Sequence, residues 1–180
     1  MISNAESALL GLLCEGPMYP YQMSKEVQER SMDEWTDLST SSIYKLLRKL
    51  EKDELLTGKV EISRGNRTRK IYKITEMGRE TLWMKVKSLL QKPQDCKWQM
   101  DIAISNLAVV GKDEVLISLK NYRASLLQKI ECYKALEKYL VETGCPGYRL
   151  GLATRPFHIL NGELKWLEKY MKHIEITEEL

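Results

Sequence analysis

Apolar residues recur at helical spacing in two short segments at the start of the chain. In residues 5–14 the apolar side chains fall on one stripe of a helix, and the pattern stops at Gly16-Pro17, a pair that ends helices. Residues 20–30 repeat the pattern, and Pro20 suits the first helical position because its missing N–H would have no partner there. The chain is therefore predicted to start with two helices joined by a tight turn.

The segment 40–53 has the strongest helical pattern of the chain. Ser39 or Thr40 stands where a side chain can cap the first helical turn. The expected inner face follows the i, i+3, i+4, i+7 spacing of an amphipathic helix: Ile43, Leu46, Leu47 and Leu50. The opposite face is polar and cationic: Ser41, Ser42, Lys45, Arg48, Lys49 and Lys52.

After this helix the apolar period changes from helical to alternating. Residues 59–63 alternate between polar and apolar side chains, which is typical of a half-buried strand. Residues 64–67 contain Gly and Asn, which tolerate the positive φ of a turn, and 68–74 return as a second strand rich in β-branched and aromatic residues. The pattern predicts a β-hairpin with a basic tip, followed by a helix that Thr75 caps.

From Trp98 onward the pattern is helical throughout, after a break at 92–95. We expect helices over about 98–110 and 113–143, and a last helix that follows Pro156. Apolar residues of the last helix step by 4, 3, 4 and 3, the spacing of a coiled-coil seam, and the long helix has a similar stripe. Because these helices have few partners in their own chain, we predict a homodimer interface made by Leu119, Tyr122, Leu126, Leu160, Leu164, Leu167 and Met171.

Together these patterns predict a mainly α fold with a small β-hairpin wing. An N-terminal winged helix-turn-helix domain is expected over 1–90, a linker over 91–97 and a C-terminal helical dimerisation domain over 98–180. Three helices followed by a two-stranded hairpin is the element order of a winged helix.

Composition fits a soluble globular protein. Hydrophobic residues make up 43% and charged residues 29% of the 180 residues, and no apolar run approaches the roughly 18 residues that cross a bilayer. The first residues lack a secretion signal, so we expect a cytoplasmic protein with no membrane partner. The four cysteines form no Cys-x-x-Cys pair and are expected to be free and mostly buried thiols. We find no nucleophile elbow, phosphate loop or metal-binding helix, so no metal, cofactor or enzymatic activity is expected.

Charge is distributed unevenly along the chain. The net charge is only +3, but residues 43–73 hold ten Lys or Arg against four acidic residues. An amphipathic helix with a cationic outer face fits the major groove of duplex DNA, and hairpin residues beside it can hold phosphates. The predicted DNA-binding residues are Tyr21, Ser41, Ser42, Tyr44, Lys45, Arg48, Lys49, Arg64, Asn66, Arg67 and Arg69.

Each basic feature taken alone is more simply a solvated surface. The combination, in this order along the chain, favours DNA binding. The alternative is a helical adaptor for protein partners, whose winged helix binds no specific DNA sequence and whose basic face is incidental.

Three stretches of the first half are similar to the PadR family of bacterial transcriptional regulators. They are Leu10–Met23 (LGLLCEGPMYPYQM), Ser41–Glu51 (SSIYKLLRKLE) and Arg69–Gly78 (RKIYKITEMG). The C-terminal half resembles the longer-tailed branch of that family, with Trp166-Leu167-Glu168 near its end. The resemblance implies a homodimeric repressor or activator on a two-fold operator, which in some members responds to phenolic compounds or drugs.

The resemblance also bears on individual residues. It implies that Tyr44 contacts DNA and that Tyr21 is a second candidate, although either ring could instead be part of the core. Pro20 and Glu54 stand where the family usually has glycine; the first is harmless at a helix start, and the second is expected to alter the turn into the wing. Trp98 is the candidate ligand residue, because an aromatic pair across a dimer could hold a flat molecule such as a small aromatic effector. We therefore expect a DNA-binding transcriptional regulator, most simply a repressor.

Overall fold

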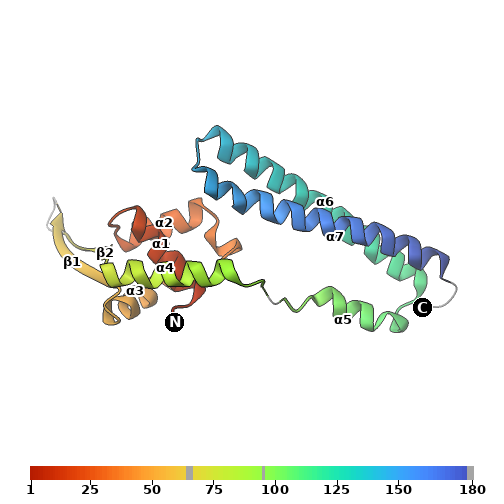
Figure 1. Ribbon diagram of the computed structural model, residues 1–180, viewed down its shortest axis with the longest axis horizontal. Coiled ribbons are helices and arrows are strands. Elements are labelled where there is room, and N and C mark those ends of the chain that lie inside the picture. Colours follow the sequence, from red (N-terminus) through yellow and green to blue (C-terminus); the bar gives the residue numbers. More distant parts are fainter. Residues whose placement is uncertain (64–66, 95, 178–180) are drawn as a thin grey trace. The chain divides into compact units, whose positions relative to one another are not determined.

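The computed structural model describes residues 1–63, 67–94 and 96–177, with only the backbone of residues 63 and 67 described. The chain divides into two compact units, Met1–Asp95 and Cys96–Leu180, and this division falls within the segment 91–97. The first, called the N-terminal unit below, contains helices and a β-hairpin, and the second, the C-terminal unit, is helical (Figure 1). The predicted fold class, mainly α with a small β-hairpin wing, is confirmed.

The N-terminal unit follows the order of a winged helix. Its elements are α1 (Asn4–Glu15), α2 (Pro20–Glu29), a short 3₁₀ turn (Met32–Glu34), α3 (Ile43–Lys52), β1 (Leu56–Ser63), β2 (Arg67–Ile74) and α4 (Glu76–Gln91). Ser3 and Glu6 form a capping box at the start of α1, and the Thr75 hydroxyl accepts the Gly78 N–H at 3.0 Å at the start of α4. The cap predicted at Thr75 is confirmed.

The core of this unit lies between α1, α2, α3 and the base of the hairpin. Leucines of α1 pack against the inner face of α3 because both stripes are apolar at helical spacing. The side chains that this packing buries completely are Leu9, Leu10, Met23, Leu38, Ile43, Leu47 and Leu50. Leu46, expected on the inner face, is only partly buried.

Helix α3 begins later than predicted. Residues 40–42 form a turn, and the helix starts at Ile43. The Ser42 hydroxyl donates to the Ser39 carbonyl at 2.7 Å and makes no bond to the first helical turn. The prediction that Ser39 or Thr40 caps this helix is therefore wrong, because the helix starts at Ile43 and the Ser39 hydroxyl hydrogen-bonds the Ser41 hydroxyl within the preceding turn.

The end of α3 shows why glycine is common there. The Leu55 N–H bonds the Leu50 carbonyl at 2.9 Å and the Glu54 N–H bonds the Glu51 carbonyl at 3.1 Å, the two bonds of a Schellman motif. This motif puts Glu54 in the left-handed region, with φ 58°. A side chain is disfavoured in that region, so Glu54 is accommodated at a cost in conformational energy.

The hairpin pairs antiparallel from Leu56 opposite Ile74 to Ser63 opposite Arg67. Its base is buried through Leu56, Tyr72 and Ile74, and Met18 in the α1–α2 turn exchanges two backbone hydrogen bonds with Tyr72. The outer half differs from the half-buried strand that the alternation predicted. Val60 and Ile62 are both exposed, because the strand extends past the core that would cover them.

The C-terminal unit is built on two long helices. After α5 (Gln99–Ser105) and a 3₁₀ turn (Leu107–Val109), α6 (Lys112–Glu142) is followed by a second 3₁₀ turn (Gly147–Leu150) and α7 (Gly151–Ile176). Helices α6 and α7 lie side by side (Figure 1). Residues of both helices form one apolar core: Val115, Leu119, Leu126, Leu167 and Ile174, with Tyr122, Leu160, Leu164 and Met171 packed partly buried against it.

This packing involves the residues predicted for the dimer seam. All seven residues assigned to it, Leu119, Tyr122, Leu126, Leu160, Leu164, Leu167 and Met171, belong to or pack against the core between α6 and α7 of the same chain. Leu167 has no exposed surface at all. Within the chain these residues pair α7 with α6, which α7 reaches through the turn at 143–150, and their place in a dimer interface stays a prediction.

Two smaller expectations also differ. Pro156 lies inside α7, which starts five residues earlier, although a proline there has no N–H for the helical hydrogen bond and crowds the carbonyl four residues before it. The four cysteines are free, but Cys14, Cys96 and Cys132 are exposed instead of buried. No helix in the described parts of the chain combines the length and apolar character needed to cross a membrane.

Candidate nucleic-acid interface

Helix α3 presents a cationic and aromatic face to solvent. Its inner residues Ile43, Leu47 and Leu50 have no exposed surface, which fixes the rotation of the helix. Tyr44, exposed over 57% of its surface, and the exposed Lys45 and Arg48 therefore point outward. Within the described residues neither Lys45 nor Arg48 forms an ion pair, so both charges are available to an external anion.

Lys49 differs from its neighbours on the same helix. Its ammonium group hydrogen-bonds the carboxylate of Glu6 on α1, the one charged residue among those found buried in the described chain. Burial alone raises the pKa of the Glu6 carboxyl, but the hydrogen bonds from Lys49 and Ser3 outweigh it and hold that pKa below its ordinary value. The same hydrogen bond raises the pKa of Lys49. This pair connects α3 to α1.

A second ion pair connects α3 to the hairpin. Lys70 on β2 donates to the Glu51 carboxylate at 2.7 Å, and this bond raises the pKa of Lys70. Gly58 on β1 leaves the space for the pair, because a Cβ there would lie 2.1 Å from the Lys70 side chain and 2.7 Å from the Glu51 carboxylate. The two pairs hold α3 between α1 and the wing.

The outer half of the wing is also held, by Tyr19. Its hydroxyl donates to the Glu61 carboxylate at 2.9 Å, which raises the Tyr19 pKa, and the Arg69 guanidinium lies 5.9 Å from the centre of its ring. Glu61 and Arg69 face each other across the two strands. Arg69 is exposed and can reach a phosphate, but a carboxylate stands beside it.

The structure describes the positions of most of the predicted contact residues. Tyr21 and Tyr44 are both exposed, which excludes the alternative that either ring is core. Ser41 and Ser42 lie in the turn that precedes α3. The assignments of Arg64 and Asn66 lie outside the described residues, and of Arg67 only its place opposite Ser63 is described.

Sequence reasoning missed the residues that hold this surface in place. Glu6 was detectable in part, since Ser3-Asn4-Ala5-Glu6 has the capping-box spacing, but its bond to Lys49 joins residues 43 positions apart. The Tyr19–Glu61 bond spans 42 positions. No local pattern marks such pairs.

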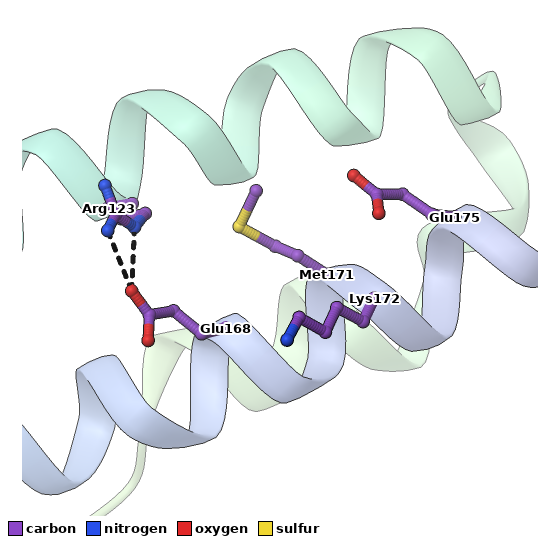
Figure 2. A pocket seen from close by; sticks show the side chains of 5 residues that line it. All are labelled: Arg123, Glu168, Met171, Lys172 and Glu175. Carbon is purple, nitrogen blue, oxygen red and sulfur yellow. Dashed lines mark hydrogen bonds and ion pairs between the residues drawn. The ribbon is translucent and has the colours of Figure 1, made fainter.

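The C-terminal unit contains a shallow surface pocket of about 370 Å³ between α6 and α7. Figure 2 shows Arg123 of α6 with both hydrogen bonds to Glu168 of α7, at 2.8 and 3.0 Å, and Met171 directed towards α6. The lining, completed by Lys172 and Glu175, carries charges of both signs. Trp98 is exposed and is not among the lining residues.

Known proteins share this fold over nearly the whole chain. Bacillus subtilis PadR in complex with operator DNA is 20% identical with a TM-score of 0.73, covering 94% of this chain and 98% of that one. The same protein in complex with p-coumaric acid is 18% identical with a TM-score of 0.74, covering 96% of each chain. The Vibrio cholerae virulence activator AphA is 14% identical with a TM-score of 0.68, covering 95% and 98%.

The fold and the outward face of α3 define a winged-helix protein. Residues 9–83 match the family model described as Transcriptional regulator PadR-like family. The resemblance drawn from the sequence motifs is therefore confirmed, and the N-terminal unit is a winged helix that is similar to the PadR-like family over residues 9–83.

Proposed function

We propose that this protein is a homodimeric transcriptional regulator that binds a two-fold operator in double-stranded DNA and acts in the cytoplasm as a repressor. The observation that carries the proposal is the face of α3 formed by Tyr44, Lys45 and Arg48, which is exposed and has no ion pair within the described residues. A helix with this face fits the major groove, where side chains reach base edges and phosphates.

The proposed contacts divide by their position on the fold. Ser41, Ser42 and Tyr44 lie at the N-terminal end of α3, the end that contacts base edges in helix-turn-helix proteins. Lys45 and Arg48 neutralise phosphates or bond guanine, and Arg69 with the predicted tip residues Arg64, Asn66 and Arg67 holds the backbone beside the groove. Tyr21, exposed at the start of α2, is a further proposed contact.

The relatives support the DNA-binding part of this proposal. PadR of Bacillus subtilis was solved with operator DNA, and AphA of Vibrio cholerae is described as an activator. Occupying an operator is the simplest way for a winged-helix protein to regulate, and it makes repression the expected outcome. A reporter gene under the chain's own upstream region distinguishes repression from activation directly.

A second copy of the chain is the proposed partner of α4. The residues predicted for the dimer on α6 and α7 pack within the chain, four of them only partly buried, and we add a second apolar surface to the proposed interface. The C-terminal half of α4 has one: Trp83, Val86, Leu89 and Leu90 are all exposed and fall on one stripe at helical spacing. Since contiguous exposed apolar patches mark interaction sites, a self-complementary contact of two α4 helices is the proposed interface.

A small aromatic effector stays a prediction, motivated by the p-coumaric acid complex of the similar Bacillus subtilis PadR. Trp98 is the side chain to test, because an exposed indole can stack on a flat ring. Titration with p-coumaric acid should quench tryptophan fluorescence, and the Trp98→Phe variant should lose that part of the quenching. Unchanged quenching in this variant would remove Trp98 from the site.

Gel-shift titration of the chain's own upstream DNA, with unrelated competitor DNA, tests the proposed function. We expect Lys45→Ala and Arg48→Ala to weaken binding at least tenfold, since each removes a charged contact worth about 1.5–3 kcal/mol. Lys138→Ala is the matched control, because Lys138 is an exposed helical lysine of the C-terminal unit. Equal binding of specific and competitor DNA would favour the protein-adaptor alternative.

A further inference from the structure

The basic residues of α3 are not equivalent, although the sequence places them on one face. Lys45 and Arg48 are exposed without an ion pair among the described residues. Lys49 is 58% exposed, yet its ammonium group is bonded to Glu6, whose side chain is only 2% exposed. A lysine that leaves such a partner to bind a phosphate would abandon a buried carboxylate without its counter-charge.

Glu6 is itself firmly placed. One carboxylate oxygen accepts the Ser3 N–H at 2.7 Å, and the other accepts Lys49. The Glu6 backbone N–H in turn donates to the Ser3 hydroxyl at 3.2 Å. The carboxylate is therefore a fixed point at the start of α1, and Lys49 attaches the last turn of α3 to it.

We propose that Glu6 and Lys49 form a positioning pair that sets the orientation of α3, and that Lys49 is not one of the DNA contacts. This inference rests on the proposed function and removes Lys49 from the DNA-binding residues that the sequence predicts. Lys45 and Arg48 then contact DNA, while the Lys49–Glu6 pair on one side and the Lys70–Glu51 pair on the other hold the helix that carries them.

The dependence of DNA affinity on salt separates a contact from a positioning residue. Each neutralised phosphate contributes a slope of about −0.9 to the plot of log affinity against log salt. Arg48→Met should make the slope less steep by about 0.9 for one phosphate contact. Lys49→Met, which keeps the aliphatic stem, should leave the slope unchanged and lower the affinity by the same factor at every salt concentration. A slope change in Lys49→Met equal to that in Arg48→Met would overturn the proposal.

Two further variants show whether Lys49 acts through Glu6. Glu6→Gln should reproduce the effect of Lys49→Met, and the double variant should bind no more weakly than the weaker single variant, because both substitutions remove the same pair. Lys49→Arg can still bond the carboxylate and should restore most of the affinity. Fully additive losses in the double variant would contradict a shared role.

Thermal unfolding without DNA distinguishes the positioning pair from the proposed function. It is measured on the wild type, Lys49→Met, Glu6→Gln and the double variant. If the pair is real, adding Glu6→Gln to Lys49→Met should not lower the midpoint further, since the second change removes the unpaired buried charge. A chain that shows this coupling but binds no specific DNA would defeat the proposed function. A chain that binds its operator but shows no coupling would defeat the positioning pair alone.

Discussion

Helices α3 and α7 carry apolar stripes of similar spacing, but their surroundings differ. The stripe of α3 is covered by α1 and α2 of its own domain, and that of α7 is covered by α6 of its own chain. The exposed faces of two helices of the N-terminal unit also differ. The exposed face of α3 is cationic, whereas the exposed face of α4 carries a tryptophan and leucines. The comparison teaches that apolar spacing identifies a buried face but not the chain that buries it.

The largest expected effect comes from Leu167, which is fully buried between α6 and α7. Leu167→Ala should destabilise the C-terminal unit by about 2–5 kcal/mol, because a cavity replaces a leucine in the core. Urea unfolding at several protein concentrations measures this loss. If the substitution instead only dissociated dimers and left the fold intact, the seam would be intermolecular after all. Ile176→Ala, at an isoleucine of the same helix that is 79% exposed, is the control and should leave the stability within about 0.5 kcal/mol.

The exposed apolar stripe of α4 contrasts with the buried apolar stripe of α7. Trp83→Ala should weaken the homodimer by about 2 kcal/mol, roughly 30-fold in dissociation constant, because a buried tryptophan at an interface is commonly a dominant contact. Sedimentation over a concentration series measures this shift. Tyr148→Ala removes an aromatic of similar exposure from the other unit and should not change the dimer. Equal effects of the two variants would place the interface elsewhere.

A smaller effect is expected at the end of α3, where Glu54 adopts φ 58°. Glu54→Gly should stabilise the N-terminal unit by about 1 kcal/mol, since glycine occupies the left-handed region without the side-chain penalty. Asp53→Gly is the matched control: with φ −83° it gains nothing and should be neutral or destabilising. Thermal melts of the two variants decide this, and a destabilised Glu54→Gly would mean that the Glu54 side chain contributes more than its backbone costs.

The smallest effect is a pH dependence from Glu6. Its folded-state pKa is lowered by Lys49 and Ser3 in spite of burial, so the stabilisation is present above the unfolded pKa near 4.5 and is lost as pH falls through the folded value. The stability difference between wild type and Glu6→Gln should therefore be constant above about pH 5.5 and shrink in acid. Lys49 is the charged partner of Glu6, and the charge of Asp53 in turn raises the pKa of Lys49. A difference that grew in acid would reverse the sign of this account.

The winged helix could be predicted from sequence because its signals are local. Thr75, the leucines of α3 and the alternation over residues 68–74 each specify their own element. The partner of α7 could not be predicted this way, because a stripe of leucines is equally compatible with α6 and with a second chain. The Glu6–Lys49 and Tyr19–Glu61 bonds connect residues more than forty positions apart and leave no pattern in either segment. The start of α3 was misplaced because serine and threonine favour turns as well as caps.

Photo-crosslinking at Tyr44 tests the central claim, that the outward face of α3 binds DNA, most directly. Benzoylphenylalanine replaces Tyr44 in one protein and Tyr139 in another, two tyrosines with similar exposures of 57% and 61% on helices of different units. With the upstream duplex, position 44 should crosslink to specific bases and lose its signal to unlabelled specific DNA, while position 139 should not crosslink. Crosslinks from position 139 alone, or equal crosslinking from both positions, would contradict the assignment of α3 as the DNA-reading helix.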